Sequence, residues 1–223
     1  MIRVLLVDDD ALVRAGLQLM LASAKDIDVV AEAGDGSEVD ALVNRHRPDL
    51  VLMDIRMPGM DGLEATRLLR NRPDAPEIVM LTTFTSDDYV LRALQAGAAG
   101  FLLKHTRPDR IIDAVRQAAA GEPVMSSEAL SQLIDTVTTN NPEPTAPAGT
   151  LSAAEARRRL EALGSREHEV ALAVSQGRTN ADIAATLYMS VPTVKSHISH
   201  ILAKLDLNNR VQIALLVYRA GLT

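Results

Sequence analysis

The stretch DLVLMDIRMPGMDG (Asp49–Gly62) joins a short apolar run to a carboxylate and then to a turn rich in glycine and proline. A second apolar run, IRVLLV (Ile2–Val7), ends in the three consecutive aspartates Asp8, Asp9 and Asp10. Apolar runs without polar alternation are typical of strands that are buried on both faces of a parallel sheet. Because ligands of open parallel sheets bind at the carboxyl edge of the strands, both runs would deliver carboxylates to that edge. The sequence therefore predicts an acidic site there.

The first part of the chain alternates such runs with segments whose apolar residues recur at helical spacing. Five pairs of this kind predict an α/β domain with a doubly wound, five-stranded parallel sheet. Glycine and proline residues separate the elements, as turns require. The expected strands are Ile2–Val7, Asp28–Ala33, Leu50–Asp54, Glu77–Leu81 and Ala99–Leu103, and the expected helices are Ala11–Ala22, Ser37–Arg45, Leu63–Asn71, Asp87–Gln95 and Pro108–Ala119.

Composition narrows the function before any motif does. With 223 residues, 47% of them hydrophobic, the chain is long enough for two compact units. It has no cysteine, which excludes disulfides and thiolate chemistry and agrees with a reducing compartment. Aromatic residues make up only 2%, which disfavours binding of single-stranded nucleic acid by base stacking. We find no signal peptide and no apolar run that could span a membrane, so we expect a cytoplasmic protein without membrane partners.

The net charge of -6 is unevenly distributed. Residues 1–125 carry 14 Lys and Arg against 20 Asp and Glu, whereas residues 163–223 carry 6 against 4. An acidic first part and a mildly basic tail fit one domain that binds cations and another that binds polyanions.

Four predicted strands end in polar residues that could act together. Asp9 and Asp54, with a backbone carbonyl just after Asp54, could bind Mg²⁺ through oxygen ligands, while Asp8 could act through water. Lys104 and Thr82 end the fifth and fourth strands, where they could reach oxygens of a phosphoryl group on Asp54. A cation would lower the charge cost of phosphoryl transfer to a carboxylate. Each residue alone fits a turn, a cap or a surface position, but the four strand ends together favour a phosphorylation site.

A segment with almost nothing large to bury follows the α/β part. TTNNPEPTAPAGT (Thr138–Thr150) has three prolines, which indicates an exposed linker. Helical spacing predicts a helix on each side of it, Ser127–Val137 and Ala153–Leu163. The second helix carries Arg157–Arg159, and a run of arginines is typical of a solvated face, with an arm that contacts DNA as the alternative.

The C-terminal tail has only helical patterns. Thr179 with Asp182 supplies an N-terminal capping signal, Ser190 supplies another, and Pro192 falls in the first turn after it. A short helix, a tight turn and a longer helix with a polar outer face are typical of a helix-turn-helix, whose second helix fits the major groove of DNA. An ordinary helical bundle with a solvated face is the alternative. The expected helices are Arg166–Gln176, Asn180–Leu187, Val191–Leu205 and Arg210–Ala220; in the third, Val194, Ile198, Ile201 and Leu205 form the buried stripe and Lys195, Ser196, Ser199 and Ala203 the outer face.

The motifs LLVDDD, LVLMDIRMPGMDG, IVMLTTF and AGAAGFLLK resemble those of the receiver domains of two-component response regulators. This resemblance implies a flavodoxin-like fold, phosphoryl transfer from a sensor histidine kinase to Asp54, and an acidic pair, Asp8 and Asp9, around Mg²⁺. His105 stands where many receivers have proline, a departure common among similar proteins. The further implied roles are a metal ligand at the main-chain carbonyl of Arg56, a switch hydroxyl at Thr82, a switch aromatic at Phe101 and a phosphate-contacting ammonium at Lys104.

The tail resembles the LuxR-type helix-turn-helix, most specifically in RTNADIA and TVKSHISHILAKL, and together with the receiver it indicates the NarL/FixJ subfamily of response regulators. Two departures stand out. Gly164 replaces the usual threonine cap, so a hydroxyl cap is lost or moved to Ser165, and Ser199 stands where a basic or amide residue is common. The resemblance implies DNA contacts by Thr193, Lys195, Ser196 and Ser199 and a phosphate contact by Arg210.

We therefore predict a receiver over residues 1–121, a linker with helical segments over 122–162 and a LuxR-type helix-turn-helix over 163–223. The expected partners are a cognate sensor histidine kinase, double-stranded promoter DNA and RNA polymerase, and phosphorylation is expected to promote a homodimer. The expected dimer contacts lie on the apolar face of the last helix, at Val211, Ala214, Leu215 and Tyr218.

Other functions share parts of this pattern. A phosphatase of the aspartyl-phosphate type also uses a strand-end aspartate and Mg²⁺, but it needs a general acid two residues after the nucleophile, where Arg56 stands. A phosphate sink that has lost DNA binding is disfavoured by the intact tail. His168, His197 and His200 could suggest a metal site, but no further ligand is placed to complete one. We accordingly expect a regulator and not an enzyme.

Overall fold

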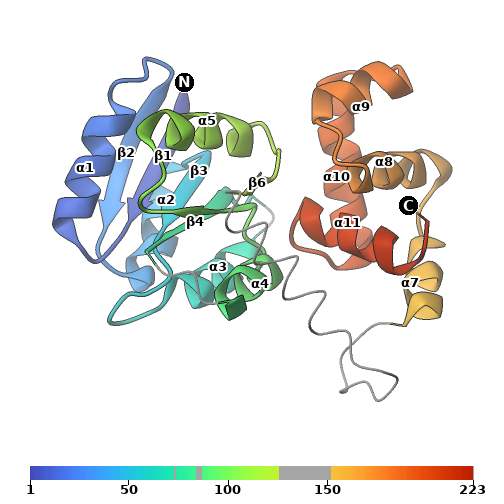
Figure 1. The fold of residues 1–223 in the computed structure, drawn as a ribbon, viewed down its shortest axis with the longest axis horizontal. Coiled ribbons are helices and arrows are strands. Elements are labelled where there is room, and N and C mark those ends of the chain that lie inside the picture. Colours follow the sequence, from blue (N-terminus) through green and yellow to red (C-terminus); the bar gives the residue numbers. More distant parts are fainter. Residues whose placement is uncertain (73, 84–86, 126–151, 223) are drawn as a thin grey trace. The chain divides into compact units, whose positions relative to one another are not determined.

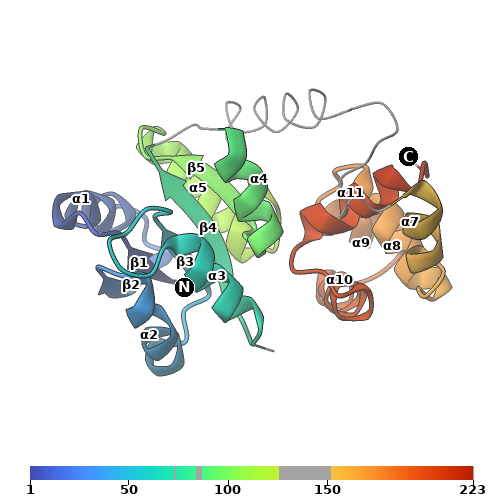
Figure 2. The same cartoon turned by 90° about the horizontal axis from the view of Figure 1, so that it is seen from below.

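The computed structural model describes residues 1–72, 74–83, 87–125 and 152–222. The chain divides into two compact units, Met1–Thr136 and Val137–Thr223, each with its own hydrophobic core. The described part of the first unit is an α/β domain, and that of the second is built from helices (Figures 1 and 2). The predicted fold class is confirmed. No helix in the described ranges has both the length and the apolar character that a membrane span requires.

The sheet of the first unit is parallel and has the strand order β2-β1-β3-β4-β5-β6. The chain builds outward from β1 in one direction to β2 and in the other to β3 and beyond, which is the doubly wound topology. Its carboxyl edge between β1 and β3 is the point where the strand order reverses. The strands are β1 (Ile2–Val7), β2 (Ile27–Ala33), β3 (Leu50–Met53), β4 (Glu77–Thr82), β5 (Gly100–Leu103) and β6 (Val124–Met125).

The sixth strand was not predicted. Gly100 pairs with Val124 and Phe101 with Met125, so the sheet continues past the receiver boundary that we predicted at residue 121. The pairing depends on glycine, because a Cβ atom at position 100 would lie 2.5 Å from the carbonyl oxygen of Val124. A strand of two residues carries no periodic signal, which explains why the pattern did not reveal it.

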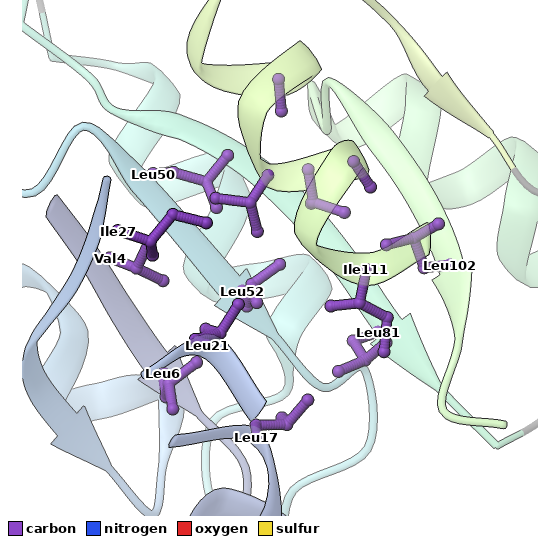
Figure 3. Packing of buried hydrophobic residues seen from close by; sticks show 14 of the residues in the cluster. Val4, Leu6, Leu17, Leu21, Ile27, Leu50, Leu52, Leu81, Leu102 and Ile111 are labelled. Atoms are coloured by element: carbon purple, nitrogen blue, oxygen red, sulfur yellow. The ribbon is translucent and has the colours of Figure 1, made fainter. Parts of the chain in front are cut away.

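Helices cover both faces of the sheet (Figures 1 and 2). Helices α1 and α5 pack on one face, where Leu17, Leu21 and Ile111 meet strand residues such as Leu6 and Leu52 (Figure 3). The strand residues that alternate with these are also buried and point to the opposite face, as the pleat requires. The helices of this unit are α1 (Ala11–Leu21), α2 (Val39–His46), α3 (Gly62–Arg70), α4 (Asp87–Ala96) and α5 (Pro108–Ala119), with a 3₁₀ turn at Gly36–Glu38 before α2.

The second unit packs its helices around one apolar cluster. The predicted stripe of the third tail helix is buried, and the capping box of Thr179 with Asp182 and the cap at Ser190 are present. The described helices are α7 (Ala153–Leu160), α8 (Ser165–Ser175), α9 (Asn180–Leu187), α10 (Val191–Leu205) and α11 (Arg210–Arg219). The other helix predicted beside the linker, Ser127–Val137, lies outside the described residues.

Helix α7 belongs to this core, because its residues Ala156 and Leu160 are buried in the cluster. The helical unit therefore begins before residue 163, where we predicted its start. The solvated face predicted for the arginines of α7 is correct for Arg157 and Arg158, which are exposed, whereas Arg159 is partly buried. Arg157 and Arg159 also donate to main-chain carbonyls at the ends of other helices.

Candidate functional site

Three carboxylates meet at the carboxyl edge of the sheet. Asp8 follows β1 and Asp54 follows β3, and the register of these neighbouring strands pairs Val7 with Met53, so both strands end at the same level. One oxygen each of Asp8, Asp9 and Asp54 lies within 4.8 Å of the other two. Asp8 and Asp54 are buried, whereas Asp9 is exposed. The order and register of the strands thus bring the predicted acidic cluster together.

Lys104 forms ion pairs with both buried carboxylates. It follows β5, and its Nζ lies 2.6 Å from Oδ2 of Asp8 and 2.8 Å from Oδ2 of Asp54. Burial raises the pKa of Asp8, although hydrogen bonds from Lys104 and from the Asp10 amide lower it in part. Burial also opposes the charge of Lys104, but its hydrogen bonds to Asp54 and Asp8 outweigh that effect and raise the pKa of the ammonium. The site therefore holds a fixed positive charge that binds carboxylate oxygens.

The third aspartate of the DDD motif has a different role. Asp10 is the N-cap of α1, and its side chain accepts a hydrogen bond of 2.8 Å from the amide of Leu12. Its own amide donates to Oδ1 of Asp8 at 3.0 Å. Asp10 therefore fixes the start of α1 and orients Asp8, as capping residues do.

The loop after Asp54 is held by close backbone contacts. Oδ1 of Asp54 accepts a hydrogen bond of 2.8 Å from the amide of Ile55, and the carbonyl of Ile55 accepts one of 2.9 Å from the amide of Gly62. A Cβ atom at position 62 would lie 2.1 Å from the carbonyl oxygen of Asp54. Only glycine permits this approach, so Gly62 sets how α3 begins beside the acceptor carboxylate.

Asp35, which sequence reasoning missed, anchors the same loop from the other side. Its carboxylate accepts hydrogen bonds from the amides of Gly59 at 2.9 Å, Met60 at 3.2 Å and Ser37 at 2.9 Å. Hydrogen bonds from Ser37 and from these amides lower the pKa of Asp35 to about 2. The available signal was its position two residues after β2, close to the edge that gathers the other aspartates.

The remaining predicted residues of the receiver site surround this cluster. Arg56 and Asp9 line one surface pocket, together with the loop that follows β3. Thr82 ends β4 and is buried, and its carbonyl accepts a hydrogen bond of 2.8 Å from the Lys104 amide. Phe101 of β5 is completely buried. The structure thus brings Asp8, Asp9, Asp54 and Lys104 into one group, with Thr82 on the neighbouring strand end.

The second unit contains the predicted helix-turn-helix, α9 and α10. Tyr188 ends α9 in the left-handed region at φ 54°, and the Ser190 side chain accepts from the Thr193 amide at 3.2 Å to begin α10. Tyr188 is 96% exposed just before α10, and the sequence pattern did not single it out. The four residues predicted to contact DNA are all exposed on the outer face of α10: Thr193, Lys195, Ser196 and Ser199.

Arg210, which was predicted to contact phosphate, binds other residues of the helical unit. Its side chain is buried, Nη1 donates to Oδ1 of Asn180 at 3.0 Å, and Nη2 donates to the carbonyl of Arg178 at 2.6 Å. The guanidinium group thus ties the start of α11 to the start of α9. Because a buried arginine needs partners for its donors, these contacts give Arg210 a structural role, and its phosphate contact stays a prediction.

The expected dimer face and the departure at Gly164 can also be located. On α11, Val211, Ala214 and Leu215 are partly exposed and Tyr218 is 66% exposed. Gly164 is the N-cap of α8 and supplies no side-chain hydrogen bond, while its amide donates to Glu167 at 2.9 Å. The hydroxyl cap is therefore lost and not moved to Ser165, which is the first helical residue.

Comparisons with known proteins agree with this architecture. Residues 4–116 match the response regulator receiver domain, and residues 161–217 match the bacterial regulatory proteins of the luxR family. The transcriptional regulatory protein LiaR of Bacillus subtilis (strain 168) is 39% identical over 219 residues, which cover 98% of this chain and 98% of LiaR. The response regulator protein VraR of Staphylococcus aureus (strain Mu3 / ATCC 700698) is 36% identical, with coverage of 99% and 98%.

Among solved structures, the response regulator ChrA of a heme-sensing two-component system is 36% identical and matches with a TM-score of 0.53, over 100% of this chain and 98% of ChrA. The match to a response regulator therefore extends over both units. The chain belongs to the two-component response regulators of the NarL/FixJ subfamily and is a transcriptional regulator that joins a receiver domain to a LuxR-type DNA-binding domain.

Proposed function

We propose that Asp54 accepts a phosphoryl group from a cognate sensor histidine kinase and that this modification promotes dimerisation and promoter binding by the helical unit. The observation that carries the proposal is Lys104, whose ammonium bridges Asp8 and Asp54 at the sheet edge. A cation so placed holds the acceptor carboxylate and is within reach of a phosphoryl group that Asp54 would carry.

The donor set at this edge fits Mg²⁺. Asp8, Asp9 and Asp54 offer hard oxygen ligands within 4.8 Å of one another, and the main-chain carbonyl of Arg56 in the adjoining pocket would be a further ligand. When bound, Mg²⁺ would neutralise charge on the phosphoryl and carboxylate oxygens. An exposed Asp9 beside two buried carboxylates suits an ion that keeps several waters.

Asp54 itself is the nucleophile of the proposed transfer. One of its carboxylate oxygens forms the bond to phosphorus as the phosphorus–nitrogen bond of the kinase phosphohistidine breaks, and the electron pair stays on the imidazole. The Ile55 amide, 2.8 Å from Oδ1, fixes the orientation of the carboxylate during this step. Lys104 already donates to Oδ2 and would transfer that hydrogen bond to a phosphoryl oxygen.

The proposed switch uses two buried residues beside the acceptor. Phosphorylation adds roughly -1.5 to -2 charge and new acceptor oxygens, and the hydroxyl of Thr82 would bind one of them. Thr82 and Phe101 are both completely or almost completely buried; Thr82 ends β4, and Phe101 lies in the neighbouring strand β5, where it pairs with Met80. Since a packed core adjusts between discrete arrangements, an inward shift of Thr82 would be accompanied by rotation of Phe101 and a changed surface near α4.

The output of the switch would be paired binding of DNA in the cytoplasm. Lys195 would contact phosphate or a guanine edge, and Thr193, Ser196 and Ser199 would contact backbone or bases in the major groove. Two copies would form a dimer through α11, at Val211, Ala214, Leu215 and Tyr218. The dimer would bind two half-sites of the promoter, where it would contact RNA polymerase.

The proposal can be tested with acetyl phosphate and the full chain. Wild-type protein should acquire acid-labile label that Asp54→Ala abolishes, while Asp28→Ala, which removes an exposed aspartate of β2, should label normally. Continued labelling of Asp54→Ala would refute the proposed acceptor. Selection of bound fragments from genomic DNA, with and without phosphorylation, tests the output. Salt-dependent binding without sequence preference would count against specific regulation.

A further inference from the structure

Helix α7 (Ala153–Leu160) lies outside the part of the chain that matches the luxR family, which begins at residue 161. It is nevertheless built into the helical unit. Ser152 caps it by accepting from the Glu155 amide at 3.1 Å, and Ala156 and Leu160 are buried in the common core. Its position therefore follows the position of the helices against which it packs.

The arginines of α7 contact the ends of two functional helices. Arg159 donates through Nη2 to the carbonyl oxygen of Leu205, the last residue of α10. Arg157 donates through Nε to the carbonyl oxygen of Ala220, which ends α11, at 2.7 Å. The last carbonyls of a helix have no partner within it, and a cation at that end also interacts favourably with the helix dipole. Each arginine thus satisfies an otherwise unpaired acceptor and holds a helix end.

A second contact holds the same end of α10. Lys204 lies 2.6 Å from the carboxylate of Glu167, which is buried at the start of α8 and also accepts from the Gly164 amide. Hydrogen bonds from Lys204 and from that amide lower the pKa of Glu167. The C-terminal end of α10 is therefore fixed from α7 and from α8, while its outer face near the N-terminus remains exposed for DNA.

We propose that α7 is a positioning helix for DNA recognition, in which Arg159 and Arg157 fix the ends of α10 and α11 and so set how the reading face and the dimer face are presented together. The inference rests on the proposed DNA contact of α10 and extends it to residues that do not touch DNA. Any change that the linker imposes on α7 then reaches both faces through two hydrogen bonds.

Arg158 provides a matched control within the same helix. Its side chain is 76% exposed and pairs with Glu155 in the same helix, at 3.1 Å. Arg158→Ala therefore removes one positive charge, as the other two substitutions do, but breaks neither of the two hydrogen bonds to carbonyl oxygens. The experiment compares Arg159→Ala, Arg157→Ala and Arg158→Ala in the full chain after treatment with acetyl phosphate. The probes are the duplex that is best enriched by genomic selection and a scrambled duplex of equal length.

We expect Arg159→Ala to bind the selected duplex roughly ten-fold more weakly, as the loss of one charged hydrogen bond would give. Binding of the scrambled duplex and the salt dependence should stay unchanged, because no phosphate contact is lost. Arg157→Ala should weaken binding of the selected duplex more than Arg158→Ala does, because Arg157, unlike Arg158, contacts the end of α11. Arg158→Ala should behave as wild type, and Arg159→Lys, which keeps a donor, should recover part of the affinity.

The proposal is overturned if Arg159→Ala weakens both duplexes equally and lowers the salt slope by about one, since that is the signature of a direct phosphate contact. It is also overturned if Arg158→Ala and Arg159→Ala behave alike. Amide hydrogen exchange in the last turn of α10 gives an independent measurement. It should accelerate in Arg159→Ala but not in Arg158→Ala, and equal rates in the two variants would refute the proposed role of Arg159.

These readouts separate two failures. If wild-type protein enriches no DNA fragment, the proposed function fails, while amide exchange still decides whether α7 holds α10. If Arg159→Ala fails to fold, Arg159→Lys takes its place, and amides at the end of α10 should exchange faster in it than in wild type or in Arg158→Ala. The positioning role of α7 would be refuted by two results together. One is amide exchange in Arg159→Lys that is identical to wild type, and the other is an unchanged preference of Arg157→Ala for the selected duplex over the scrambled one.

Discussion

Substitution of Gly62 by alanine tests whether backbone packing sets the position of Asp54. The added methyl carbon would lie 2.1 Å from the Asp54 carbonyl oxygen, whereas ordinary contacts of this kind begin at 3.4 Å. The loop or α3 must therefore move by about 1.3 Å to relieve the contact. Overpacking of this kind costs about 1–3 kcal/mol, and the better helix propensity of alanine offsets up to about 1 kcal/mol. We expect Gly62→Ala to lower the free energy of unfolding by about 1–2 kcal/mol.

The same movement should affect phosphorylation more than stability. A misplacement of about 1 Å in a reacting group can lower a rate about 100-fold, so acetyl phosphate should label Gly62→Ala about 100 times more slowly than wild type. The assay is the initial rate of acid-labile labelling, with urea denaturation of the same samples to confirm that the unit is folded.

Gly16→Ala is the control, because position 16 lies within α1 and no atom lies within 4 Å of an added Cβ. It should label at the wild-type rate and gain about 0.5–1 kcal/mol in stability. A folded Gly62→Ala protein that labels as fast as Gly16→Ala would refute the argument that this contact places the acceptor carboxylate.

Three further predictions follow from charged groups. In buffer without Mg²⁺, Lys104→Met should lower the free energy of unfolding, measured by urea denaturation, by about 2 kcal/mol, because it leaves Asp8 and Asp54 without their shared cation. Addition of Asp8→Asn to this variant should partly reverse the loss. Strictly additive effects of the two substitutions would argue against an interaction between Lys104 and Asp8. The pKa of Asp35 is lowered from 3.8 to about 2, so its contribution to stability is present above pH 3.8 and is lost as the pH falls through about 2. Between pH 5 and pH 2, the free energy of unfolding should therefore fall less for Asp35→Asn than for wild type. Equal falls in the two proteins would contradict this role of Asp35. Arg210→Ala should destabilise the helical unit by about 2–3 kcal/mol and leave the salt dependence of DNA binding unchanged. If the slope of the log binding constant against log salt concentration became smaller by about one, the result would support a phosphate contact by Arg210.

The sequence predicts the elements and the acidic site because both follow from local rules. Apolar runs buried on two faces identify the strands, and the rule that such strands end at one ligand-binding edge brings Asp8, Asp54 and Lys104 together before any coordinates are known. Helix ends were predicted to within one or two residues where a capping residue such as Thr179 or Ser190 marks them.

The missed features depend on contacts that no local pattern encodes. A guanidinium group that meets a distant main-chain carbonyl, as in Arg157 and Arg159, has the same sequence context as one in solvent. Arg210 was assigned to DNA by resemblance, yet its partners are Asn180 and the carbonyl of Arg178, which only the folded chain places beside it. Asp35 was overlooked because it acts on a loop more than twenty residues away.

Strand β6 has a consequence for the solubility of receiver fragments. Without Val124 and Met125, β5 would be an edge strand whose four residues are all buried and apolar or glycine, with a row of unpaired amides and carbonyls. Exposed edges of this kind pair with other chains and lead to aggregation, and short covering strands are one natural protection against it. A fragment that stops at residue 121 therefore loses the cap of its own sheet, whereas one that extends through residue 125 retains it.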